Sequence, residues 1–259
     1  MSFLETMFSL KGKVAAVIGG GGVLAGAMAK GLAQAGADIA ILDLNADSAQ
    51  AMADTMSSLG VKSLAVSGNA TSKEQLHDAE QTIAAKLGTV DILINAPGIN
   101  SSTPFFEITE DEYDKIMAVN LKSMFLASQV FGKAMIDSGK PGSIINISSA
   151  SSGPPLSKVF TYSVSKAGVN NLTQYLAREW ATQGVRVNAI APGFFPAEQN
   201  RKILTDERVA DIMRHTPMNR FGEAEELVGA TVWLASENAS SFVTGALIRV
   251  DGGYTAMTI

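Results

Sequence analysis

Apolar and polar positions along this chain follow two alternating patterns. Short apolar runs, typical of buried strands, are separated by longer segments in which apolar residues recur every three or four positions, as on one face of a helix. The run Ser143–Ile147 is apolar without strict alternation, as expected of a strand buried on both faces. The alternation of strand and helix predicts an α/β fold with a parallel sheet flanked by helices on both faces.

The number of strand-like runs sets the size of the predicted sheet. No linker, low-complexity tract or internal repeat divides the chain. We therefore expect a single-domain, doubly wound fold with a seven-stranded parallel sheet. The predicted strands are Val14–Ile18, Ile39–Leu42, Ser63–Val66, Ile92–Asn95, Ser143–Ile147, Val185–Ile190 and Ala246–Val250.

The composition excludes several kinds of function. The chain has 259 residues and a net charge of −5, without the clustered Lys and Arg that bind phosphates, so we expect no nucleic-acid partner. It contains no cysteine, and its two histidines, His77 and His215, lie far apart, so we expect no disulfide and no metal site. No signal peptide and no run of ~18 apolar residues is evident, which favours a cytoplasmic protein without a membrane partner.

One tyrosine, one lysine and one serine have a spacing that indicates proton transfer. Tyr162 and Lys166 are four positions apart in a helical pattern, which places them on one helix face. Lowering a tyrosine pKa from ~10 to near neutrality takes roughly 4 kcal/mol. An ammonium at ~4 Å and an effective dielectric of ~20 supplies about that much. Ser149 lies thirteen positions before Tyr162 (162 − 149), where it could assist the same reaction.

A glycine-rich segment after the first strand predicts a dinucleotide site. Gly19–Gly22 precede a helical pattern, so backbone amides could approach a pyrophosphate at the positive end of that helix. Asp43 ends the second strand, where a carboxylate accepts hydrogen bonds from ribose hydroxyls. The same charge repels a 2′-phosphate by roughly 2 kcal/mol at ~4 Å in water. These features predict NAD(H) rather than NADP(H) as the cofactor.

Over essentially its whole length the chain resembles the short-chain dehydrogenase/reductase superfamily. The pattern T-G-x-x-x-G-[IL]-G falls on Ile18–Ala25, with Ile18, Val23 and Ala25 as departures. The N-N-A-G segment is represented by Asn95–Gly98, in which Pro97 has no amide proton. The closing pattern T-G-x-x-x-x-V-D-G-G occupies Thr244–Gly253. The resemblance implies one NAD(P)-binding Rossmann domain over residues 1–259, with a substrate lid at about 194–216.

The resemblance also implies roles for four catalytic residues. Tyr162 donates a proton to the substrate carbonyl oxygen, or removes it in the oxidative direction, and Ser149 hydrogen-bonds the same oxygen. Lys166 lowers the pKa of the tyrosine and holds the nicotinamide ribose. Asn120 orders a water that connects the lysine to solvent. Ser148 is the competing serine, which strand alternation is expected to point to the other face.

Further positions are implied to bind the cofactor, among them Asn69 where the family has an aspartate, and Pro192 and Gly193 beside the nicotinamide. Ala197 stands where the family often places a threonine that contacts the cofactor amide. The implied cofactor-binding residues are Gly19, Gly22, Leu24, Asp43, Leu44, Asn69, Ala70, Asn95, Gly98, Tyr162, Lys166, Pro192, Gly193 and Phe195.

The segment expected to contact the substrate resembles that of one branch of the superfamily. The string F-F-P-A-E-Q-N-R at Phe194–Arg201 is similar to D-mannonate oxidoreductases (fructuronate reductases), relatives of gluconate 5-dehydrogenases. That likeness implies reversible reduction of a keto sugar acid, with Arg201 holding the carboxylate. Alternatively, Glu198–Arg201 begins a solvated helix. The candidate substrate residues are Asn100, Ser151, Gln199, Asn200 and Arg201.

Other functions stay open beside this one. A 3-oxoacyl thioester reductase is the second enzyme hypothesis, although the chain shows no basic patch for an acyl carrier. Enoyl reductases resemble Y-x6-K rather than the spacing of Tyr162 and Lys166, and a hydrolase triad lacks a histidine partner. A non-catalytic NAD-sensing scaffold is the non-enzyme alternative. The resemblance further implies a homotetramer, assembled through the tyrosine-bearing helix and the C-terminal strand.

Overall fold

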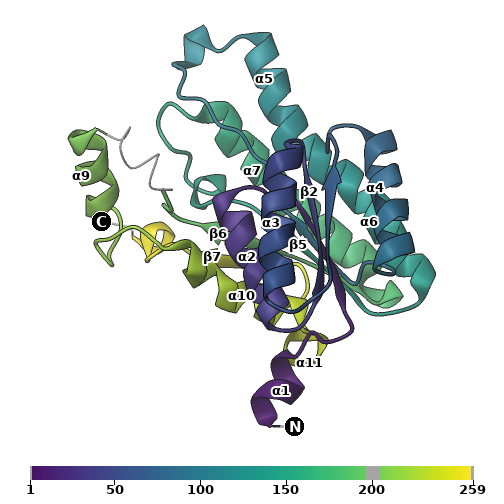
Figure 1. Ribbon diagram of the computed structural model, residues 1–259. Helices are drawn as coiled ribbons and strands as arrows, with labels where there is room; N and C mark the ends of the chain where they lie inside the picture. Colours follow the sequence, from purple (N-terminus) through teal and green to yellow (C-terminus); the bar gives the residue numbers. More distant parts are fainter. Residues whose placement is uncertain (1, 197–204, 258–259) are drawn as a thin grey trace.

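The computed structural model describes residues 2–196 and 205–257, and the strands within them form one seven-stranded sheet. Every neighbouring pair is parallel, in the order β3-β2-β1-β4-β5-β6-β7 (Figure 1). The strands are β1 (Val14–Ile18), β2 (Asp38–Asp43), β3 (Ser63–Ser67), β4 (Ile92–Asn95), β5 (Gly142–Ile147), β6 (Val185–Pro192) and β7 (Leu247–Val250).

Helices connect the strands and cover the sheet. The α-helices of the described residues are α1 (Phe3–Phe8), α2 (Val23–Gln34), α3 (Ala46–Ser58), α4 (Lys73–Lys86), α5 (Glu110–Met117), α6 (Ser123–Ser138), α7 (Phe160–Trp180), α9 (Asp206–Arg214), α10 (Val228–Ala235) and α11 (Glu237–Ser240). Short turns of other helix types are η1 (Phe105–Glu107), η2 (Ala118–Lys122), η3 (Ala150–Ser152), η4 (Ala181–Gln183), η5 (Ala224–Leu227) and η6 (Tyr254–Ala256).

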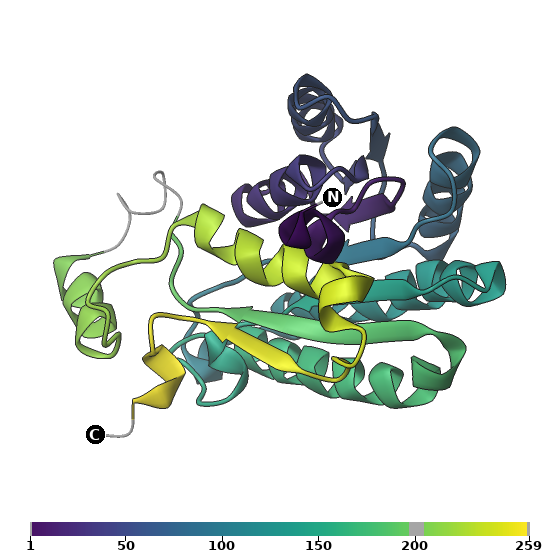
Figure 2. The ribbon, with the colours of Figure 1, turned by 90° about the horizontal axis from the view of Figure 1, so that it is seen from below.

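Alternate residues of the central strand β1 enter two separate cores. Ala15 and Val17 pack into a cluster with apolar side chains of α2, α3 and α10. Ala16 and Ile18 pack into a second cluster with side chains of α4, α6 and α7. Figure 2 shows these helices as layers on opposite sides of the sheet. Because both faces of the central strands are buried, most of their residues are apolar, which is why these strands could be recognised.

The predicted α/β architecture is confirmed, and several strand ends differ from the prediction by one or two residues. β6 continues to Pro192 instead of ending at Ile190, and β7 begins at Leu247 rather than Ala246. The proline is tolerated because the pairing of β6 with β5 has already ended at Ile190, and on the other side Gly193 donates to the carbonyl of Val250 at 2.9 Å. The longer β6 carries Pro192 and Gly193 to the edge of the sheet at which β1 and β4 also end.

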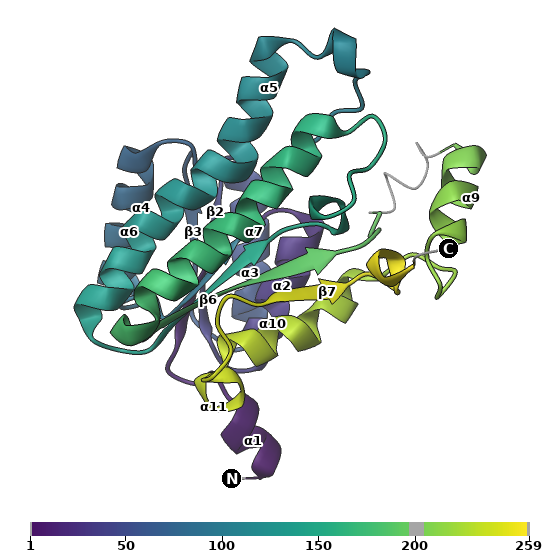
Figure 3. The same cartoon turned by 180° about the vertical axis from the view of Figure 1, so that it is seen from behind.

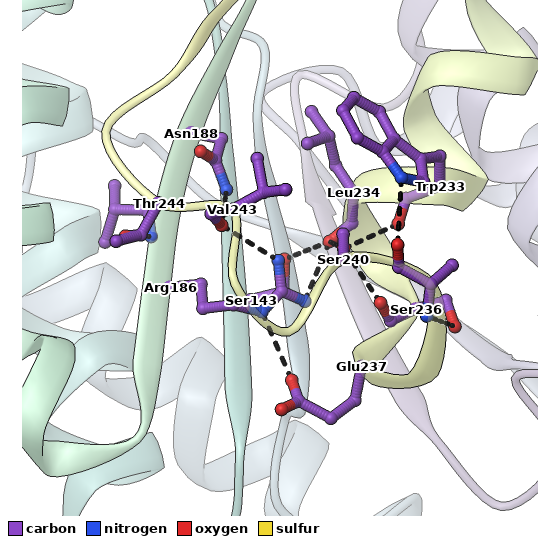
Figure 4. A network of polar contacts seen from close by, with 12 residues as sticks. Ser143, Arg186, Asn188, Trp233, Leu234, Ser236, Glu237, Ser240, Val243 and Thr244 are labelled. Atoms are coloured by element: carbon purple, nitrogen blue, oxygen red, sulfur yellow. Dashed lines mark hydrogen bonds and ion pairs between the residues drawn. The ribbon is translucent and has the colours of Figure 1, made fainter.

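A buried arginine ties the sheet to the C-terminal helices. Arg186 of β6 donates from Nε to Glu237 at 3.2 Å and from Nη2 to the Leu234 carbonyl at 3.0 Å (Figure 4). Ser143 of β5 donates to the same carbonyl at 2.8 Å. Burial lowers the pKa of Arg186, and the hydrogen bond to Glu237 opposes that change. The network fixes the far end of the sheet, away from the predicted site.

The segment predicted to cover the substrate is described only in part. Residues 197–204 lie outside the described residues, and the following helix α9 lies to one side of the layers (Figure 3). No helix in the described ranges 2–196 and 205–257 is long and apolar enough to cross a membrane. The same ranges contain no group of three or more His, Asp or Glu side chains placed to hold a metal ion.

Candidate active site

The glycine-rich segment forms a close turn where the strand order reverses between β1 and β4. Gly19 has a φ of +74°, and a Cβ at this position would lie 3.1 Å from backbone atoms of Ala96 and Pro97. Only glycine fits such a turn. The following helix α2 begins after Gly22 without a side-chain cap, so no side chain competes for its first amides. An anion at this helix end would meet backbone donors and the positive end of the helix dipole.

Asp43 lies beside this turn and accepts a hydrogen bond from its backbone. Its Oδ2 accepts a hydrogen bond from the Gly21 amide at 3.0 Å, and its Oδ1 accepts one from the Asn45 amide at 2.9 Å. A Cβ on Gly21 would lie 3.0 Å from Asp43 Oδ2 and 2.8 Å from Ser48 Cβ, so the glycine permits the approach. The neighbouring Leu44 is 74% exposed. Backbone donors, a carboxylate and an exposed apolar side chain together fit a dinucleotide.

Two other predicted cofactor residues make contacts within the protein. The Oδ1 of Asn69 accepts hydrogen bonds from the amide and the hydroxyl of Thr71, at 2.9 and 2.8 Å. Asn95 is fully buried and donates to Asn146 Oδ1 at 2.9 Å, while Asn146 donates to Thr173 on α7. The Asn95 side chain therefore links β4 to β5 and, through Asn146, to α7.

The four predicted catalytic residues come from three separate segments. Ser149 follows β5 and caps the short turn η3, whereas Tyr162 and Lys166 lie on the first turns of α7. Asn120 lies in η2, a π-helical turn between α5 and α6. The structure places Ser149 close enough to Tyr162 to affect the pKa of the phenol, and the Lys166 amine lies 5.7 Å from the centre of the tyrosine ring.

The charges at this site differ from the expectation drawn from the sequence. Burial lowers the pKa of Lys166 from its ordinary 10.5 to about 8. The Lys166 amine donates to the Ile147 carbonyl at 2.8 Å. Burial also raises the pKa of Tyr162, and only a hydrogen bond from Ser149 opposes this. In the protein alone, desolvation of the phenol thus outweighs the hydrogen bond from Ser149, and the sequence does not reveal this desolvation.

The Asn120 side chain makes three hydrogen bonds within the protein. Its Oδ1 accepts from the Ile99 amide at 2.8 Å, and its Nδ2 donates to the Ile99 carbonyl at 2.9 Å and to Ser165 Oγ at 3.1 Å. It therefore attaches the loop after β4 to α7. The Oδ1 accepts only one of these hydrogen bonds, so its second lone pair is available for the water that the family resemblance implies.

Two of the predicted substrate residues lie in the described part of the chain. Ser151 is 1% exposed, and its hydroxyl and amide both donate to Ser149 Oγ, at 3.0 and 3.2 Å. Asn100 is exposed and accepts from the Ser101 amide at 2.9 Å. The other candidates lie outside the described residues: Gln199, Asn200 and Arg201.

The residues after β6 pack against the C-terminal segment. A Cβ on Gly193 would lie 2.7 Å from Asp251 Cα, and one on Gly222 would lie 2.3 Å from the Phe195 ring. A cavity of about 380 Å³ lies beside them; its described lining includes Phe195 and Arg249 but none of the four predicted catalytic residues. We do not equate this cavity with the reaction site, because the hydroxyls that could act on a substrate lie elsewhere.

The sequence analysis did not identify the residues that fix the segment around Ser149 by hydrogen bonds. Ser148 donates to Asn170 Oδ1 at 2.6 Å, and Asn170 Nδ2 donates to Ser152 Oγ at 2.8 Å. Ser148 was expected to point away from the catalytic residues, yet it contacts the helix that carries them. The available signal was the position of Asn170, one helical turn after Lys166 on α7.

Comparison with known proteins identifies the family. The family model described as "Enoyl-(Acyl carrier protein) reductase" matches residues 22–255. The gluconate 5-dehydrogenase of Gluconobacter oxydans is 35% identical, over 96% of this chain and 97% of that protein. With the parallel sheet and the Ser–Tyr–Lys site, these matches mean that the chain belongs to the short-chain dehydrogenase/reductase family of oxidoreductases.

Two solved structures resemble the chain over nearly its full length. One, from Haemophilus influenza, is provisionally named a D-mannonate oxidoreductase and contains NAD; it is 37% identical, covers 98% of this chain and 99% of its own, and has a TM-score of 0.93. The other is a gluconate 5-dehydrogenase from Burkholderia cenocepacia in complex with NADP and tartrate; it is 33% identical, covers 98% and 99%, and also has a TM-score of 0.93. The neighbours thus include binders of either dinucleotide.

Proposed function

We propose that this protein is an NAD(H)-dependent oxidoreductase that interconverts a keto group and a secondary alcohol on a sugar acid, such as D-fructuronate and D-mannonate. The observation that carries the proposal is the position of Tyr162 and Lys166 on α7 against the end of β5, where Ser149 follows: the buried Lys166 amine donates to the Ile147 carbonyl at 2.8 Å and lies 5.7 Å from the centre of the Tyr162 ring. Relatives named for gluconate and mannonate support the substrate class.

Each residue has a distinct task in this proposal. When bound, the reduced nicotinamide supplies the hydride for the carbonyl carbon. Tyr162 then gives its proton to the carbonyl oxygen, and the raised pKa of the phenol keeps that proton in place until it is needed. Lys166, with a pKa of about 8, can return a proton to the phenolate near neutral pH.

Ser149 acts as a hydrogen-bond donor to the same oxygen. Its Oγ already accepts two hydrogen bonds from Ser151, one from the amide and one from the hydroxyl. Since a hydroxyl has two lone pairs and one proton, the group that Ser149 has left to offer is its O–H. A donor fixed in this way stabilises the negative charge that develops on the substrate oxygen.

The preference for NAD(H) rests on Asp43. Its carboxylate is held at the glycine turn by the Gly21 amide, where the ribose of a bound dinucleotide would lie. A 2′-phosphate there would meet a negative charge at a cost of roughly 2 kcal/mol. The neighbour that contains NAD supports this preference. Because another neighbour binds NADP, the preference is to be tested by comparing kcat/KM for NADH and NADPH.

Sugar acids are favoured over the other candidate substrates. The name of the family model suggests enoyl reduction, but a tyrosine four positions from its lysine resembles the carbonyl reductases of the superfamily. A 3-oxoacyl thioester on an acyl carrier calls for a basic surface, whereas the chain carries a net charge of −5. An NAD-sensing scaffold has no need of the Ser149–Tyr162 pair.

NADH consumption with a panel of ketones tests the proposal. Keto sugar acids, the corresponding neutral ketoses and acetoacetyl thioesters are compared at equal concentration. We expect the highest kcat/KM with a keto sugar acid. Highest activity with a thioester would replace the proposed substrate class, and no NADH oxidation with any ketone would favour the scaffold alternative.

We also propose a homotetramer formed through α7 and β7. Large apolar side chains are exposed near these elements, including Val164 and Tyr175 on α7 and Phe242 before β7. Burial of such groups against other copies would remove apolar surface from water. Light scattering coupled to size-exclusion chromatography should give four times the chain mass; the mass of one chain would rule the assembly out.

A further inference from the structure

Three side chains, Ser148, Asn170 and Ser152, form a hydrogen-bonded chain beside Ser149. The Ser149 carbonyl accepts from Ser152 Oγ at 2.6 Å, and Ser152 Oγ accepts from Asn170 Nδ2 at 2.8 Å. On the other flank, Ser148 donates to Asn170 Oδ1 at 2.6 Å and lies 3.3 Å from the Lys166 carbonyl. The residues on either side of Ser149 are therefore held by one side chain of α7.

The hydrogen-bond pattern fixes which way the Asn170 amide points. A hydroxyl has a single proton, and Ser152 gives its proton to the Ser149 carbonyl. Ser152 must therefore receive a hydrogen bond from Asn170, which only the amide nitrogen can supply. The amide oxygen is left to accept from Ser148, as the 2.6 Å contact indicates. Both ends of the amide are used, and no other side-chain type of this size offers a donor and an acceptor side by side.

The position of Asn170 links this chain to the reaction. It lies on α7 one turn after Lys166 and two turns after Tyr162, so it belongs to the same rigid helix. Ser149, by contrast, lies at the start of a short turn after β5, where only the local contacts define its place. The distance between the serine and tyrosine hydroxyls thus depends on what ties that turn to α7.

We propose that Asn170 is a positioning residue that sets the catalytic serine, through Ser148 and Ser152, at the separation from Tyr162 that the substrate oxygen needs. Asn170 itself touches neither substrate nor cofactor. The inference deepens the proposed function and rests on the role given there to Ser149. Loss of the amide lets the Ser149 turn move relative to α7, and a displacement of about 1 Å at reacting groups costs ~100-fold in rate.

Four single variants test whether Asn170 positions Ser149 through these hydrogen bonds. Asn170→Ala removes both contacts, and Asn170→Asp keeps an acceptor for Ser148 but no longer donates to Ser152. For both we expect kcat to fall about 10- to 100-fold, with the Kd for NADH within about twofold of wild type. Ser152→Ala breaks the same chain from the other side and should act in the same direction. Asn171→Ala is the matched control, since Asn171 is the exposed neighbour on the same helix and should leave kcat unchanged.

A double-mutant comparison separates positioning from general damage. If Asn170 acts through Ser149, then Asn170→Ala should lower kcat no further in a Ser149→Ala background. An equal fold-loss in both backgrounds, or a single Asn170→Ala variant within twofold of wild-type kcat, would overturn the inference. Ser152→Ala leaves α7 intact, so it decides the matter even if the Asn170 variants fail to fold.

The outcome for Ser149 itself distinguishes two failures. If Ser149→Ala retains full activity, the proposed function loses its donor and the inference falls with it. If Ser149→Ala is inactive while the Asn170 and Ser152 variants are fully active, the proposed function stands and only the positioning role is wrong.

Discussion

Replacing Lys166 by methionine should alter the pH dependence of stability while it removes turnover. The lysine is 3% exposed, and burial lowers its pKa from 10.5 to about 8. Methionine has a similar length and no charge, so it removes the titrating group with little change in volume. The cost is the hydrogen bond to the Ile147 carbonyl at 2.8 Å.

The expected magnitude follows from the two pKa values. The interval from about 8 to 10.5 corresponds to roughly 3 kcal/mol at ~1.4 kcal/mol per pH unit. This is the free-energy cost of keeping the buried ammonium charged in the folded protein near neutral pH. The unpaired Ile147 carbonyl in the variant costs about 1–3 kcal/mol, so the net change near pH 7 is small.

The sign of the pH dependence is fixed by which state binds the proton. Between pH 8 and 10.5 the unfolded chain keeps the Lys166 proton while the folded protein has released it. Stability therefore rises with pH in this window, by ~1.4 kcal/mol per pH unit for this group. The variant lacks that gain. The free energy of unfolding of wild type minus that of Lys166→Met should increase by about 3 kcal/mol across the window.

Urea unfolding followed by tryptophan fluorescence, at equal protein concentration and several pH values between about 7 and 10, measures this difference. All other titrating groups are common to both proteins, so their contributions cancel. A difference that stays constant over this range would mean that the Lys166 amine is solvated. A difference that falls as the pH rises would mean that the folded protein favours the ammonium, and the argument from burial would be wrong.

Two further predictions concern the cofactor turn. Asp43→Asn removes the charge that faces a 2′-phosphate and should raise the ratio of kcat/KM for NADPH to that for NADH by about 30-fold, the equivalent of roughly 2 kcal/mol; Asp54→Asn on the exposed side of α3 is the control, and an unchanged ratio would remove Asp43 as the determinant. Gly21→Ala brings a Cβ within 2.8 Å of Ser48 and 3.0 Å of Asp43, so the Kd for NADH should rise about tenfold or more. Gly229→Ala meets nothing within 4 Å and should bind NADH normally, and equal affinities of the two variants would contradict the tight approach at the turn.

The central strands could be predicted because they are buried on both faces and are therefore mostly apolar. Burial of the alternate residues Val17 and Ile18 in different cores explains why the strand β1 shows no polar alternation. The pairing of Tyr162 with Lys166 could be predicted as well, because helical spacing alone places two residues four apart on one face. In each case the signal lies within a few neighbouring residues.

Features that depend on contacts between distant segments could not be predicted. The hydrogen bond from Asn170 to Ser152 depends on how α7 packs against the end of β5. The direction of the pKa change at Tyr162 was misjudged for a similar reason, because the sequence gives the charge of the neighbour but not the extent of desolvation.

The most direct test of the central claim is a comparison of Tyr162→Phe with wild type and with Tyr175→Phe, an exposed tyrosine on the same helix. We predict that Tyr162→Phe loses at least about 1000-fold in kcat for reduction of its best keto substrate, a loss within the range that general acid catalysis contributes. Its Kd for NADH should stay within about twofold of wild type, and Tyr175→Phe should be fully active. Retention of a tenth or more of wild-type kcat by Tyr162→Phe would contradict the assignment of this phenol as the proton donor.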